Sequence, residues 1–171
     1  MKSDLKDCFE RGSRYLIYLI GGGGLSTLIS IFAVVPIRML TGHIWELVWT
    51  TVLETVIMMS VVFYKGYKVG YKEGKCKAVI VIVSMIIASV FHLIYSAVFG
   101  FSMWTAPPAF YLGFLIYCLK NGVREIVMFP DIYTFSTLWI FNALYVFAAY
   151  WGERTGAKRR KLERDNLIKK Q

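Results

Sequence analysis

Four apolar stretches of the chain predict four membrane-spanning helices. They cover residues 15–39, 44–64, 78–101 and 133–151. A helix needs about 20 apolar residues to cross the hydrocarbon core of a bilayer, and each stretch is near that length. With 57% hydrophobic residues in a chain of 171, there is no room for a second globular domain. The pattern therefore predicts an all-α integral membrane protein, with a segment 1–14, a helical bundle over 15–152 and a tail 153–171.

A fifth apolar segment, residues 103–119, is interrupted near its start. Pro107 and Pro108 suit the first turn of a helix and disfavour its interior. The helical part is then 109–119, which is about 16 Å long and spans half a membrane. Asn121-Gly122 predicts a turn after it. We therefore expect residues 103–130 to form a re-entrant or interfacial segment on the outer side; a complete fifth crossing is the alternative.

Basic residues indicate which side each loop faces. Seventeen of the 20 Lys and Arg residues lie in segments 1–14, 64–77 and 153–171. The positive-inside rule places both termini and the loop 64–77 in the cytoplasm, which requires an even number of crossings. An Ile- and Lys-rich composition suggests a bacterial inner (cell) membrane. Cys8 and Cys76 lie beside these Lys-rich segments, and the three cysteines have no spacing that indicates a disulfide framework or a metal site.

Polar residues at similar depth on different helices form the candidate binding site. Glu54 needs an explanation because an acid inside a bilayer costs several kcal/mol unless it is partnered or hydrated. His92, on the next predicted helix, lies at a depth similar to that of Glu54. Asn142 and Ser30 complete a possible polar layer. Arg38 and Arg124, two of the three bases outside the basic segments, are the remaining candidates, as outer contacts for an anionic group.

Three interpretations of Glu54 and His92 remain open. The two residues form an internal polar clasp between helices, they bind a ligand or share a proton as a coupled pair, or they do not touch. A stripe of Gly22, Ser26 and Ser30 on the first helix predicts close packing against a neighbouring helix.

The basic segments are expected to anchor the chain to anionic lipid at the cytoplasmic membrane surface. Tyrosines alternate with lysines in the loop 64–77, and the tail is expected to form a short amphipathic helix or a docking tail for a partner. Basic runs beside membrane spans follow from topology, so nucleic acid is not an expected partner. The anchoring candidates are Lys65, Lys68, Lys72, Lys158, Arg159, Arg160 and Lys161.

No catalytic motif such as HExxH or GxSxG is found, and no cofactor or metal site is predicted. Residues 14–27, with a glycine run and Leu25-Ser26-Thr27, resemble the opening of the small four-helix GtrA-like proteins associated with polyprenyl-linked sugars. The long outer segment departs from that family, and membership is not assigned. The function expected is binding or translocation of a small solute or lipid headgroup, as a homo-oligomer or as a subunit of a larger complex. The alternative is a non-transporting scaffold or regulatory protein, and an enzyme is the least favoured class.

Overall fold

A computed structural model describes residues 2–41, 43–100, 102, 105–121 and 131–168. The described residues form five α-helices: α1 (Lys2–Thr41), α2 (His43–Glu73), α3 (Ala78–Phe99), α4 (Pro107–Asn121) and α5 (Asp131–Ile168). The helices α1, α2, α3 and α5 are each long and apolar enough to cross a membrane, whereas α4 is not. The all-helical fold and the four long helices confirm this part of the prediction.

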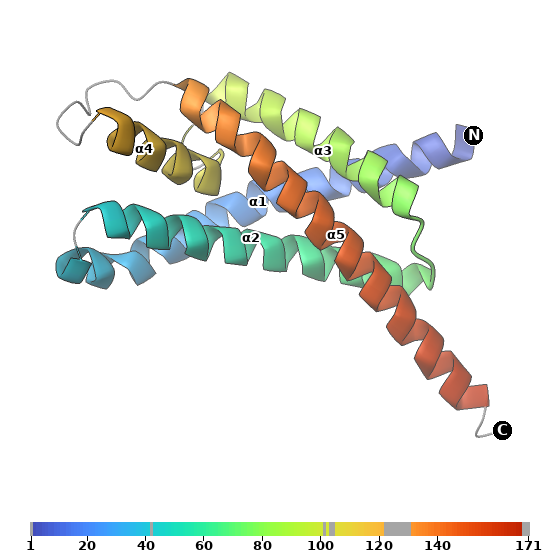
Figure 1. Cartoon of the computed structure of the whole chain (residues 1–171). Helices are drawn as coiled ribbons and strands as arrows, with labels where there is room; N and C mark the ends of the chain where they lie inside the picture. Colours follow the sequence, from blue (N-terminus) through green and yellow to red (C-terminus); the bar gives the residue numbers. More distant parts are fainter. Residues whose placement is uncertain (1, 42, 101, 103–104, 122–130, 169–171) are drawn as a thin grey trace.

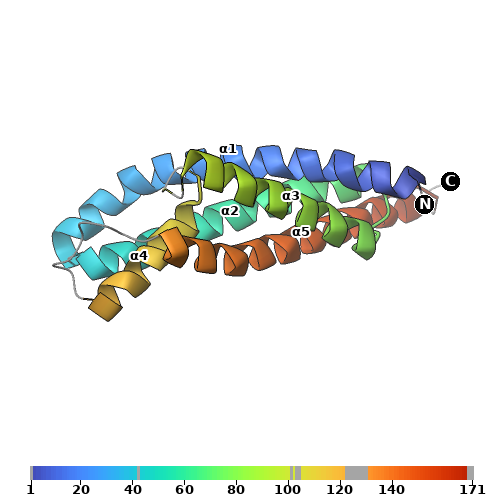
Figure 2. The same ribbon diagram turned by 90° about the horizontal axis from the view of Figure 1, so that it is seen from above.

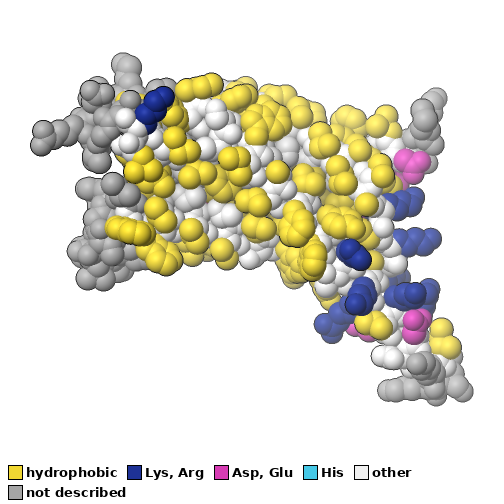
Figure 3. Space-filling model, in the orientation of Figure 1, with side chains coloured by type: hydrophobic (Ala, Val, Ile, Leu, Met, Phe, Trp, Pro, Cys, Tyr) yellow, Lys and Arg dark blue, Asp and Glu magenta, His cyan; other side chains and the backbone are white. Residues whose placement is uncertain are grey.

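The four long helices lie along one another in an elongated bundle (Figure 1). Both termini and the connection between α2 and α3 are at one end, and the turn between α1 and α2 is at the other (Figures 1 and 2). Hydrophobic side chains cover the body of the bundle in Figure 3, and Lys and Arg side chains gather at the end that holds the termini. We call this the basic end.

Two helices extend further than the sequence predicted. Segment 64–77 is not a loop, because α2 continues to Glu73 and only residues 74–77 connect it to α3. The tail is not a separate helix, because α5 runs without interruption from Asp131 to Ile168 and leaves the bundle at the basic end (Figure 1). A hydropathy pattern marks the apolar part of a helix and says little about where the backbone stops being helical.

Helix α4 begins with Pro107 and Pro108 in its first turn, as predicted. It has 15 residues and packs mainly against α5 and α2. Thr137 on α5 donates a hydrogen bond of 2.7 Å to the carbonyl oxygen of Ala109. Helix α4 is thus packed onto α5 and α2 at the end of the bundle opposite the basic end (Figure 1).

Glycines bring the backbones of α2 and α5 into contact. A Cβ atom added to Gly66 would lie 2.5 Å from the carbonyl oxygen of Ala149, and one added to Gly70 would lie 2.0 Å from that of Glu153. The contact is reciprocal, since a Cβ at Gly152 or Gly156 would lie 2.2 or 2.1 Å from a carbonyl oxygen of α2. Two glycine pairs at a spacing of four residues, one on each helix, therefore set this crossing.

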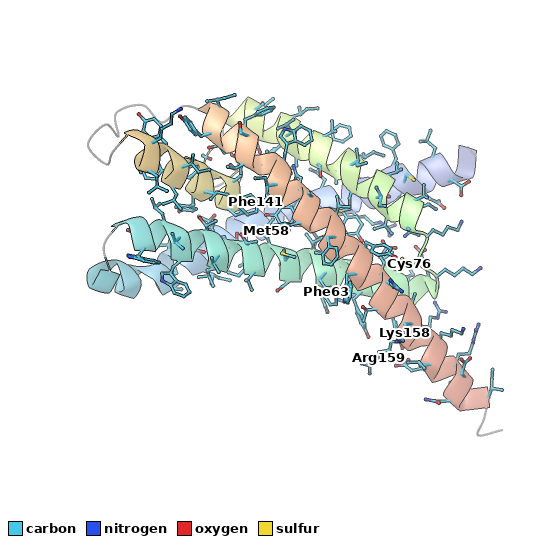
Figure 4. The ribbon with its side chains drawn as sticks, viewed as in Figure 1. Met58, Phe63, Cys76, Phe141, Lys158 and Arg159 are labelled. Atoms are coloured by element: carbon cyan, nitrogen blue, oxygen red, sulfur yellow. The ribbon has the colours of Figure 1, made fainter. Side chains whose placement is uncertain are left out.

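The stripe of Gly22, Ser26 and Ser30 on α1 packs against other helices of the bundle. Gly22 faces Met58 and Val61 of α2, and Ser26 and Ser30 are buried. Met58 also belongs to the core between α2 and α5, as does Phe141 (Figure 4).

Candidate functional site

The polar residues of the predicted layer fall into two separate groups, and Glu54 lies at the centre of one of them. Its side chain is 0% exposed. The hydroxyl groups of Ser30 and Thr27 on α1 lie beside the carboxyl group, and the phenol groups of Tyr111 on α4 and Tyr145 on α5 are within electrostatic range of it. Neither carboxyl oxygen accepts a hydrogen bond of good geometry from any described residue. Four helices therefore enclose a carboxyl group that has polar neighbours and no cation among the described side chains.

His92 belongs to a second polar group, which holds the turn before α4. Its Nε2 donates a hydrogen bond of 2.9 Å to the carbonyl oxygen of Thr105, and Ser96 donates one of 3.1 Å to the same oxygen. The Thr105 hydroxyl in turn donates 2.6 Å to the carbonyl oxygen of Gly100. Asn142 on α5 lies beside the imidazole ring. These bonds satisfy buried backbone groups, so His92 is a structural clasp between α3 and the turn.

The structure does not bring Glu54 and His92 into contact. No hydrogen bond or ion pair joins them, and α2 and α3 do not pack against each other in the described part of the chain. Of the three open interpretations of Glu54 and His92, this arrangement agrees with the one in which the two residues do not touch. Helix α5 contributes to both groups, since Asn142 and Tyr145 stand almost one turn apart on it.

The remaining site candidates have separate outcomes. Ser30 lies next to Glu54, and Asn142 lies next to His92. The Arg38 side chain and the whole of Arg124 lie outside the described residues, so their predicted roles stay predictions. Within the described ranges, no three His, Cys, Asp or Glu side chains gather as metal ligands do.

A buried ion cluster near the basic end was not predicted. Glu153 on α5 is 0% exposed; its carboxylate accepts hydrogen bonds of 2.9 Å from the Arg11 guanidinium and 2.9 Å from the Tyr15 hydroxyl, both on α1. Arg11 also pairs with Glu73 at the end of α2. Three helices are thus joined through one arginine. In the sequence, Arg11 and Glu153 are single charges among many, and only the spatial meeting of α1 with α5 distinguishes them.

The predicted anchoring residues make several contacts with the protein itself. Lys65 lies over the Tyr18 ring of α1 at 4.5 Å, and Lys68 lies over the Tyr64 ring at 4.6 Å. Arg160 donates to the carbonyl oxygen of Tyr71 at 3.2 Å, and Arg159 pairs with Glu163 at 3.1 Å. The Arg160 contact ties the start of the tail to the end of α2. Anchoring to lipid stays a prediction.

Cys76, in the connection between α2 and α3, offers a test of sidedness. Burial raises the pKa of its thiol, and the negative charge of Glu153 adds to the effect. Cys8 is only 6% exposed and is therefore the poorer target. Since the thiolate is the reactive form, a raised pKa means less thiolate at a given pH. We expect Cys76 to react slowly with an impermeant maleimide at pH 7, and its rate to keep rising above about pH 8.5, the ordinary thiol pKa.

The matched experiment labels right-side-out and inside-out membrane vesicles, with Cys76→Ser as the blank. Reaction of Cys76 only in inside-out vesicles is the expected result. Reaction from the outside would reverse the predicted orientation.

Comparison of the chain with protein-family models, with curated protein sequences and with solved structures found no match. The resemblance of residues 14–27 to GtrA-like proteins thus has no support from a family model.

Proposed function

We propose that this protein is a multi-pass membrane protein that binds a small solute carrying a positive charge, a proton or an ammonium headgroup included, at the buried carboxyl group of Glu54. Translocation of that solute across the membrane is the activity that we infer. The single observation that supports the proposal is that Glu54 is fully buried among four helices while neither of its oxygens accepts a hydrogen bond of good geometry from a described residue.

The physical reason is the free energy of a charge in a medium of low dielectric constant. A carboxylate at the centre of a membrane costs several kcal/mol unless a cation or water compensates it, and such residues commonly mark substrate, ion or proton pathways. Glu153 shows the compensated alternative in the same molecule, with a guanidinium and a phenol bonded to it. Among the described residues, the side chains near Glu54 are neutral: the hydroxyl groups of Ser30 and Thr27 and the phenol groups of Tyr111 and Tyr145. A proton or a cationic group would supply what this site lacks.

In the proposed arrangement, α1, α2, α3 and α5 cross the membrane with both termini in the cytoplasm, and α4 is the predicted re-entrant or interfacial segment. Its 15 residues are too few for a crossing, and its contacts with α5 and α2 satisfy the requirement that such a segment be covered by protein. Tyr111 places α4 at the Glu54 group. Movement of α4, whose preceding turn is held by His92, would then open or close the route to Glu54 from outside.

The test is a flux measurement in sealed proteoliposomes, with protons, Na⁺ and methylammonium as probes. We expect the wild-type protein to raise the flux of at least one probe, and Glu54→Gln to return that flux to the rate of protein-free vesicles. The matched control is Glu46→Gln, which changes an acid on the same helix that is partly exposed. Glu54→Gln should keep its detergent melting temperature within about 4 °C, the shift that corresponds to roughly 1 kcal/mol.

Two results would contradict the proposal. One is a wild-type protein that moves none of the three probes; the other is unchanged flux in Glu54→Gln.

The scaffold alternative is weakened by one observation. The Gly22, Ser26 and Ser30 stripe is already covered by α2 and is not free to hold a partner. The exposed end of α5 beyond the bundle remains available to the scaffold alternative as a surface for binding a partner (Figure 1). A soluble protein that co-purifies with the wild-type chain, and not with a chain ending at residue 157, would favour it.

A further inference from the structure

A groove runs between α2 and α5 on the outside of the bundle, on the part of the two helices nearer the basic end. It has a volume of about 520 Å³ and is lined by Met59, Ser60 and Phe63 of α2 and by Phe147, Ala148 and Trp151 of α5. Ala148 is almost fully buried, whereas Phe147 and Trp151 are half exposed. Phe63 lies where α5 crosses α2 (Figure 4). The size is within the range of ligand pockets, about 300–1,000 Å³.

The chemistry of the groove favours an apolar occupant. Ser60 is the one polar side chain among the described lining residues, and its hydroxyl donates to the carbonyl oxygen of Val56 at 2.7 Å. The Phe147 and Trp151 rings pack on each other with centroids 5.7 Å apart and form one wall. A hydrocarbon chain matches this surface, because a hydrocarbon has no group that needs a hydrogen bond.

A basic pocket continues from the groove along the same face of α5. It has a volume of about 370 Å³ and is lined by Trp151, Arg154, Thr155 and Lys158. Trp151 therefore belongs to both the groove and the pocket. The positions 147, 151, 154 and 158 recur at intervals of three or four residues, so they form one stripe that leads from the apolar body toward the tail.

Arg154 and Lys158 differ from Arg159 and Arg160 in their pairing. Neither forms a hydrogen bond or ion pair with another residue that the structure describes, whereas Arg159 and Arg160 are bonded to Glu163 and to the Tyr71 carbonyl. Figure 3 shows Lys and Arg side chains where hydrophobic side chains end. A half-exposed tryptophan followed by two uncompensated cations is the arrangement expected at the level of lipid phosphates.

We propose that the groove and the basic pocket together form a binding site for one anionic phospholipid, with an acyl chain against Ala148 and the phosphate between Arg154 and Lys158. The charge of the pocket selects an anionic headgroup, and the groove selects a lipid over a free phosphate ion. The site is separate from Glu54 and holds whether or not the protein transports a solute. An occupant here covers the line along which α2 and α5 cross.

Native mass spectrometry of the full-length protein in detergent tests the proposal, with phosphatidylglycerol and phosphatidylcholine of identical acyl chains as probes. We expect wild type to bind one phosphatidylglycerol in preference to phosphatidylcholine. The double variant Arg154→Gln with Lys158→Gln should weaken the binding of phosphatidylglycerol by about tenfold to thirtyfold. The control variant Lys161→Gln with Arg164→Gln removes two exposed bases further along the tail. It should change the affinity for phosphatidylglycerol by less than about threefold.

The groove has its own matched pair of variants. Ser60→Phe fills the groove, while Ser136→Phe places the same side chain on an exposed serine that also donates to a backbone carbonyl, that of Ile132. We expect Ser60→Phe alone to lose the bound lipid. Equal affinity for the two lipids in wild type, equal loss in the two charge pairs, or equal binding by the two phenylalanine variants would each overturn the proposal.

Discussion

Gly70→Ala should be one of the most destabilising single changes in this protein. The added methyl group would lie 2.0 Å from the carbonyl oxygen of Glu153, a backbone atom that moves only if α2 and α5 separate. Overpacking of this kind costs up to about 3 kcal/mol, and more where backbone must shift. The expected loss exceeds the roughly 1 kcal/mol that alanine gains over glycine in a helix.

Gly21→Ala is the matched control, because nothing lies within 4 Å of a Cβ added there. Unfolding in sodium dodecyl sulfate, monitored by circular dichroism, gives the free energy of unfolding of each variant. Gly21→Ala should be neutral or slightly stabilising. Equal stability of the two variants would mean that the glycine contact between α2 and α5 is absent.

Arg11→Ala should cost about 3–5 kcal/mol in the free energy of unfolding, the usual effect of removing one partner of a buried ion pair. Glu153 would remain fully buried with its negative charge, and only the Tyr15 hydroxyl would still donate to it. Arg14→Ala is the control, since Arg14 pairs with Glu10 on an exposed face of the same helix. Such exposed pairs contribute about 0.5 kcal/mol or less.

A double variant separates charge from packing. Arg11→Met with Glu153→Gln removes both charges and leaves an amide oxygen for Tyr15, so most of the lost stability should return. If Arg11→Ala and Arg14→Ala lower stability equally, the buried cluster has no structural role.

The fold class and the helices were predictable from hydropathy, and the start of α4 was predictable from Pro107 and Pro108. The ends of α2 and α5 were not, because their last turns carry Lys, Arg and Tyr side chains that read as a loop in an apolar pattern. The glycine contact has a signal in the sequence, because Gly66 and Gly70, like Gly152 and Gly156, are spaced by four residues.

The candidate site was only partly predictable. Glu54 was recognisable as an acid within an apolar stretch, and Ser30 could be placed near it by depth. The partner of His92 could not be predicted, because helices that follow each other in sequence need not be neighbours in a bundle. Here α2 and α3 do not pack against each other. Glu153 was hidden for a related reason, since its burial depends on Arg11 and Tyr15, more than 130 residues away.

The proposed role of Glu54 is tested most directly by modification with dicyclohexylcarbodiimide, an apolar reagent that couples to carboxyl groups inside membranes. Peptide mass spectrometry of the folded protein should find the adduct on Glu54 and not on Glu153, whose carboxylate is held by Arg11 and Tyr15. An excess of the transported probe should slow the modification of Glu54. A folded protein in which Glu54 stays unmodified, or is modified at the same rate with and without that probe, would contradict a solute site at this carboxyl group.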